Sequence, residues 1–142
     1  MIKNFKCPLI LLAFILLACN TDDGDLVSPC EFTAFIDLDV YNEPSQSEFT
    51  IESTQINDSC LDITFSASGC DGESWVVQLV SDIPLQAGDF GGANLSLKFT
   101  NPEVCEAYIT KTYSFSVLDY LNGLEGIYFN LQGWEEPLTF IN

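Results

Sequence analysis

The chain has 142 residues, with 21 acidic and 4 basic side chains, a formal net charge of −17 and no histidine. Binding to nucleic acid depends on Lys and Arg displacing counterions from phosphates, so this charge excludes DNA and RNA as partners. Without histidine, neither a Ser-His-Asp triad nor a histidine-ligated metal centre can be built. No glycine-rich loop precedes a predicted helix, so no phosphate-binding loop is expected, and we expect no cofactor.

Residues 1–18 have the pattern of a secretory signal peptide. Lys3 and Lys6 make the start of the chain positive, and residues 7–18 are apolar. A helix needs about 20 apolar residues to cross a bilayer, so this run is too short for a membrane span. A basic start, a short apolar run and a small residue before the cleavage point are typical of exported chains. A buried hydrophobic helix is the alternative, but no later segment has the helical period to pack against it.

The four residues Leu16-Leu17-Ala18-Cys19 resemble the lipobox of bacterial lipoproteins. The resemblance implies cleavage before Cys19, followed by acylation of its thiol and of the new amino group. Two or more acyl chains anchor a protein stably, whereas a single chain gives only marginal, reversible binding. The resemblance therefore implies a protein held at the membrane by lipid on Cys19.

An acidic segment follows directly, with Asp22, Asp23 and Asp25. It is similar to the export signal of surface lipoproteins of Bacteroidota, which usually carries lysine, glutamine or serine where this chain has Asn20-Thr21. The resemblance implies a lipid anchor in the outer membrane and exposure on the cell surface. The alternative is that residues 19–29 are only a polar tether, because a run of charge is usually solvated.

Removal of the signal peptide would leave a strongly acidic chain of about 124 residues, which is enough for one domain. Its only basic side chains would be Lys98 and Lys111, which against 21 acids give a charge of −19. An anionic lipid surface would repel such a domain, so the membrane is a partner through the lipid anchor alone.

Four cysteines remain in the mature chain: Cys30, Cys60, Cys70 and Cys105. An even number in an exported chain predicts two disulfides with three possible connectivities. Zinc is disfavoured because no C-x-x-C pair and no histidine is present. Cys60 and Cys70 lie at opposite ends of one predicted strand, over 20 Å apart at about 3.3 Å per residue, whereas a disulfide spans about 7 Å between Cα atoms. The order of the strands favours Cys30–Cys60 and Cys70–Cys105.

Alternation of apolar and polar residues predicts a strand in each of eight segments, the clearest being Leu61, Ile63, Phe65 and Ala67 on one face. Gly, Pro, Asn and Asp separate the segments, and only residues 118–121 suggest a helical turn. The sequence predicts an all-β domain over residues 30–142, an immunoglobulin-like sandwich of two antiparallel sheets. The predicted strands cover residues 32–40, 49–56, 61–67, 75–80, 95–99, 106–117, 127–131 and 138–141.

One residue interrupts the pattern of the sixth segment, because Lys111 falls on its apolar parity. Either a β-bulge shifts the register there, or the lysine extends its ammonium group out to water at the edge of the sheet.

Carboxylates and aromatic rings are the candidate functional groups. Acidic pairs as used by glycosidases occur at Asp37 with Asp39 and at Asp71 with Glu73. A solvated surface is the better explanation of such pairs, because neighbouring acids occur by chance in so acidic a chain. Calcium could use the turn at 71–73 or Asp89, although the D-x-D-x-D-G order of a calcium loop is absent.

Aromatic rings could stack on sugars, and Trp75, Trp134, Tyr120 and Tyr128 are the candidates. Trp75 lies on an apolar parity, which indicates core packing. Trp134 in its loop and Tyr128 are the better candidates for binding a ligand. The sequence therefore predicts a non-catalytic surface lipoprotein that binds a glycan or a partner protein, or serves as an accessory module. The alternative is a small carboxylate-dependent glycan hydrolase.

Overall fold

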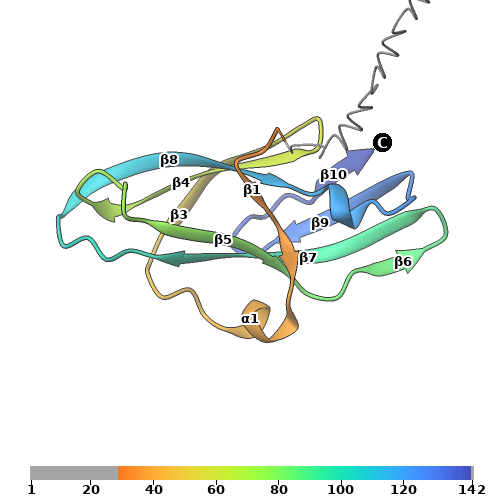
Figure 1. Ribbon diagram of the computed structural model, residues 1–142, viewed down its shortest axis with the longest axis horizontal. Helices are drawn as coiled ribbons and strands as arrows, with labels where there is room; N and C mark the ends of the chain where they lie inside the picture. Colours follow the sequence, from red (N-terminus) through yellow and green to blue (C-terminus); the bar gives the residue numbers. More distant parts are fainter. Residues whose placement is uncertain (1–28, 142) are drawn as a thin grey trace, which may run out of the picture.

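The computed structural model describes residues 29–141, which fold into short strands with very little helix (Figure 1). The elements are β1 (Phe32–Thr33), β2 (Phe35–Ile36), α1 (Leu38–Asn42), β3 (Thr50–Asn57), β4 (Cys60–Gly69), β5 (Val76–Ser81), β6 (Leu85–Ala87), β7 (Phe90–Thr100), β8 (Ala107–Ser116), the 3-10 turn η1 (Leu118–Tyr120), β9 (Gly126–Leu131) and β10 (Leu138–Ile141). The helical turn expected at 118–121 is therefore confirmed.

The strands form two stacked sheets, which confirms the all-β sandwich (Figure 1). One sheet has four strands in the order β1-β8-β4-β3, and the other has six, ordered β10-β9-β7-β5-β2 with β6 beside β7. The expectation that all pairs are antiparallel is wrong, because β1–β8, β2–β5 and β7–β9 are parallel. β7 and β9 run in the same direction because the chain crosses to the other sheet as β8 and then returns.

The segment predicted as one strand over 32–40 changes sheets and then becomes a helical turn. β1 pairs with β8 in one sheet, β2 pairs with β5 in the other, and Ala34 between them is buried. The strand stops at Ile36 because the Asp37 carboxylate accepts hydrogen bonds from the backbone N–H groups of Asp39 and Val40, both at 3.0 Å. This is the N-cap of a helix, so α1 replaces the rest of the expected strand.

The segment expected to be irregular, residues 82–93, contains a hairpin. β6 pairs with the first residues of β7, so β7 begins at Phe90 rather than near residue 95. Gly88 lies in the turn with φ of +66°, a conformation that glycine adopts without strain.

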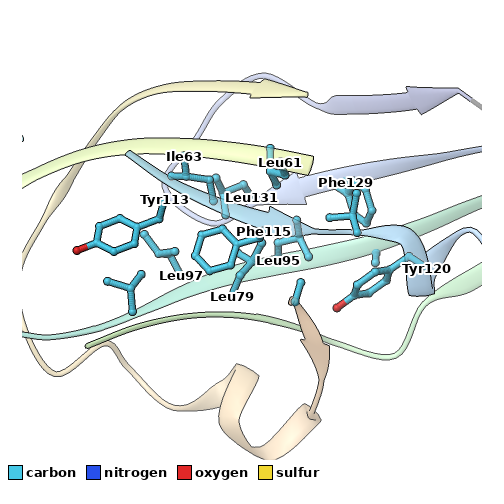
Figure 2. Packing of buried hydrophobic residues seen from close by; sticks show 14 of the residues in the cluster. Leu61, Ile63, Leu79, Leu95, Leu97, Tyr113, Phe115, Tyr120, Phe129 and Leu131 are labelled. Carbon is cyan, nitrogen blue, oxygen red and sulfur yellow. The ribbon is translucent and has the colours of Figure 1, made fainter. Parts of the chain in front are cut away.

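The core lies between the two sheets and follows the alternation of the sequence (Figure 2). Leu61 and Ile63 from β4 face Leu95 and Leu97 from β7, as the inner faces of two packed sheets do in a β-sandwich. Phe65 is fully buried and is surrounded by four aromatic rings at centroid distances of 5.1 to 5.6 Å. These rings belong to Phe49, Trp75, Phe99 and Tyr113.

Two disulfides link Cys30 to Cys60 and Cys70 to Cys105, with Cα–Cα distances of 5.6 and 4.8 Å. This is the connectivity that the order of the strands favoured. The second bridge joins the β4–β5 connection to the β7–β8 connection, because both connections lie at the same end of the sandwich (Figure 1).

Glu103 holds the same two connections together. Its carboxylate accepts backbone hydrogen bonds from Cys70, Asp71, Gly72 and Ser74, and a further one from the Ser74 hydroxyl at 3.0 Å. Desolvation alone would raise the pKa of Glu103, but these hydrogen bonds favour the charged form and lower its pKa to about 2. Glu103 thus stabilises this end of the fold as a carboxylate.

Lys111 follows the second of the two alternatives, because the pairing of β4 with β8 shows no register shift at Phe65 and Lys111. β1 covers β8 only at Phe115 and Ser116, so Lys111 lies on an open stretch of that strand. Its ammonium group reaches Glu73 at 3.0 Å. Since Glu73 is largely exposed, this ion pair adds little stability.

Candidate functional site

Several predicted site residues lie outside the described part of the chain, namely Cys19, Asp22, Asp23 and Asp25. Within residues 29–141, no helix is long and apolar enough to span a membrane. In the same part of the chain, no three His, Cys, Asp or Glu side chains gather closely enough to hold a metal ion.

Most of the acidic residues considered for catalysis accept hydrogen bonds from backbone N–H groups or form an ion pair with a lysine. Asp37 caps α1, and Asp39 is the second residue of that helix rather than a neighbour on a strand face. Asp71 accepts a hydrogen bond from the backbone N–H of Glu73 at 2.9 Å, and Glu73 binds Lys111. These contacts give Asp37, Asp71 and Glu73 a structural role.

Trp134 follows β9 and packs partly against the core. Its indole N–H is buried and has no hydrogen-bond partner among the described residues. The ring lines a hollow of about 300 Å³ together with Ile51, Gly133 and the exposed pair Glu135 and Glu136. The described surroundings of Trp134 are thus those of a residue that closes the edge of the sandwich near β3.

Tyr128 lies on the outer face of the six-stranded sheet, where 48% of it is exposed. Its ring stacks beside Phe90 with a centroid distance of 6.0 Å and an angle of 29° between the planes. Tyr128 and Trp134 line different hollows, so the structure does not bring the two predicted binding residues together.

Part of this outer face is covered by α1 and the loop that follows it (Figure 1). The Lys98 ammonium group donates hydrogen bonds to the backbone carbonyls of Tyr41 and Glu43, which fixes that loop over β7. Desolvation lowers the pKa of Lys98, while the negative charge of Glu43 opposes this effect. The other part, near β6 and β9, remains open.

The open part contains a hollow of about 190 Å³, which we call the outer hollow. Its lining combines a carboxylate, two amides, one aromatic ring and several small or apolar residues. They are Asp82, Ile83, Leu85, Gly91, Gly92, Ala93, Asn94, Tyr128 and Asn130.

The polar side of the outer hollow is a chain of hydrogen bonds. Asp82 accepts from the backbone N–H of Asn94 at 2.8 Å and from its side-chain amide at 2.6 Å. The Asn94 side-chain oxygen in turn accepts from the Asn130 amide at 3.2 Å. An ionised carboxylate only accepts, so Asp82 determines which way both amides are turned. The Asn130 oxygen therefore faces away from Asn94 and accepts nothing from the described residues.

Sequence reasoning placed Tyr128 among the ligand-binding candidates but missed Asp82, Asn94 and Asn130. A signal was present, because Asn is depleted in strands and both asparagines occupy outward positions of alternating segments. That the two asparagines are neighbours could not be predicted, because it depends on the parallel register of β7 and β9, in which Asn94 pairs with Asn130.

The sequence matches no protein-family model and no curated protein. Two solved structures from Bacteroides are similar to it. A NigD-like immunity protein from Bacteroides caccae has a TM-score of 0.58 and 11% identity, and the match covers 78% of this chain and 63% of that one. A DUF1344 protein of unknown function from Bacteroides vulgatus has a TM-score of 0.49 and 20% identity, with 78% and 56% covered.

At these identities, the likeness to the NigD-like protein shows a shared sandwich fold and nothing more specific. The chain spans less than two thirds of the length of either neighbour.

Proposed function

We propose that the mature protein is a lipid-anchored, non-catalytic binding module on the outer surface of a Bacteroidota cell. The signal-like residues 1–18, the lipobox-like Leu16 to Cys19 and the acids that follow support the anchor and the display. The similar structure from Bacteroides caccae, with a TM-score of 0.58, is named a NigD-like immunity protein, which supports an accessory role.

The outer hollow is the observation that carries the binding function. It presents amides of fixed orientation beside an exposed aromatic ring, on the part of the sheet face that α1 and its loop leave open. Small-molecule sites combine apolar walls with a few well-placed polar groups, and this hollow has that composition. The carboxylate in it, Asp82, has both oxygens bound by Asn94, so it is poorly suited to transfer protons.

Metabolic labelling with a palmitate analogue tests the anchor. The wild type should be labelled, and Cys19→Ala should not be, because it removes the acylated thiol. Cys7→Ala is the matched control, since Cys7 belongs to the signal segment and should not affect the label on the mature chain. Label retained on Cys19→Ala would refute the proposed anchor.

Protease added to intact cells tests the display. The wild type should be degraded, whereas replacing Asp22 and Asp23 together with alanine should leave a labelled but protected protein. Protection of the wild type in intact cells and its loss after lysis would show that the acids do not act as an export signal.

A further inference from the structure

We propose that the outer hollow binds a neutral sugar ring, held by stacking on Tyr128 and by two hydrogen bonds to Asn130. The proposal rests on the function proposed above, because it names the ligand of that binding module. Three properties of the hollow lead to it, namely its shape, the orientation of its amides and its lack of cations.

The shape comes from one row of residues across the sheet. Leu85 of β6 pairs with Gly92 of β7, and Gly92 pairs with Tyr128 of β9. Gly92 has no side chain, and a Cβ placed there would meet only the backbone oxygen of Tyr128 within 4 Å, at 3.8 Å. The row therefore has an open floor at Gly92 between two walls, one aliphatic and one aromatic.

The volume of about 190 Å³ lies below the roughly 300–1,000 Å³ of sites for drug-sized ligands. It suits a single six-membered ring rather than an extended molecule. A sugar ring offers an apolar face of C–H groups to an aromatic wall and hydroxyls at its edge. Tyr128 beside the open floor supplies that wall.

The polar edge is matched by Asn130. Because Asp82 orients Asn94 and Asn94 orients Asn130, the free groups of Asn130 are its oxygen, an acceptor, and its second N–H, a donor. Two neighbouring hydroxyls of a sugar can donate one hydrogen bond and accept the other. The fixed orientation lowers the entropy lost on binding, since the amide need not search for its orientation.

The charge of the surroundings selects a neutral sugar. Lys98 and Lys111 are the only cations of residues 29–141, and each is held elsewhere, the first by backbone carbonyls near α1 and the second by Glu73. The outer hollow contains Asp82 and no basic residue. A sugar acid would therefore meet like charge without a partner, which disfavours binding.

The other sheet provides a matched control surface. Tyr108 on β8 is 65% exposed and lines a larger hollow of about 460 Å³ with Ser66 and Ser68. There the Ser66 hydroxyl is already paired with Thr110 at 2.7 Å, and no asparagine lines the hollow. Tyr108 thus tests whether any exposed tyrosine suffices.

The experiment presents the mature protein, purified from membranes in detergent, to an array of neutral, uronic and sialylated oligosaccharides. The wild type should bind a neutral glycan. Tyr128→Ala and the isosteric Asn130→Asp, which removes both amide donors, should each weaken binding about tenfold, equivalent to about 1.4 kcal/mol. Tyr108→Ala should bind within about twofold of the wild type. Equal melting temperatures establish that the variants fold.

Failure of this inference is distinct from failure of the proposed function. Absence of any bound neutral glycan, a preference for acidic sugars, or unchanged binding by Tyr128→Ala overturns the sugar site, while labelling of Cys19 and surface display are unaffected. Cleavage of a bound glycan would instead overturn the non-catalytic assignment. Loss of neutral-glycan binding in both hollow variants, with Tyr108→Ala unaffected, supports the site.

Discussion

Replacing Phe65 with leucine should cost far more stability than the same change at Phe129. Both side chains are fully buried, so the apolar area lost with each ring is similar. Their neighbours differ, because Phe65 contacts four aromatic rings, whereas Phe129 pairs with one among the described residues, that of Tyr120. The comparison isolates the energy of ring pairing from that of burial.

The expected difference follows from three additional pairs. Aromatic pairs contribute about 0.5–1.5 kcal/mol each beyond burial, which brackets the difference between about 1.5 and 4.5 kcal/mol. Contacts that share one ring are not additive, so the lower part of this range, about 1.5–2.5 kcal/mol, is expected.

Urea unfolding of a form lacking the first 19 residues, with both disulfides intact, would measure the difference. The slope of free energy against urea should be the same in wild type and both variants, so that midpoints report stability alone. If the two leucine variants differ by less than about 0.5 kcal/mol, the aromatic cluster adds nothing to burial and the reasoning is refuted.

Three further predictions concern local contacts. The pKa of Glu103 is lowered from 4.5 to about 2, so the hydrogen bonds of its carboxylate stabilise the fold above pH 4.5 and are lost as the pH falls toward 2. The urea midpoint of Glu103→Gln should therefore change less than that of the wild type between about pH 5 and pH 2. Replacing Cys70 and Cys105 together with serine should cost about 3–4 kcal/mol by chemical denaturation, given a loop of 35 residues. Asp37→Ala removes the cap of α1 and should cost about 1 kcal/mol, whereas an unchanged melting temperature would contradict that role.

Alternation predicted the parts of the fold in which one face of a strand is buried. Leu61, Ile63, Phe65 and Ala67 are all buried as predicted, because β4 lies in the middle of its sheet with its inner face on the core. The disulfide pairing could be predicted for a related reason, since the number and length of the strands decide at which end of the sandwich each connection lies.

Alternation does not say which strands are neighbours, so the order and direction of the strands in the two sheets could not be predicted from it. The parallel pairing of β7 with β9 depends on the crossing of β8 to the other sheet, a tertiary choice with no local signal. Asp37 shows a second limit, because the same residue fits the polar position of a strand and the N-cap of a helix.

Of the residues that line the outer hollow, only the aromatic one, Tyr128, could be predicted from the sequence as a binding residue. Tyr128 has the outward parity of a strand, so its exposure could be inferred from the sequence. The chain of hydrogen bonds from Asp82 to Asn130 joins three segments that are 12 and 36 residues apart. It forms only through their register in the sheet, which a single sequence does not encode locally.

The bridge between Cys30 and Cys60 has a mechanical consequence. Tension applied to the chain ahead of residue 29 would enter the folded domain at Cys30 and pass through the sulfur atoms to Cys60. Cys60 begins β4, which is paired along its length with β8 and with β3 on the other side. The load would bypass the two-residue strand β1, which would otherwise be the first to peel away. With the proposed lipid anchor at its N-terminus and the proposed ligand pulling on it, the domain would thus transmit force through its longest ladder, β4 with β8, for as long as that bridge stays oxidised.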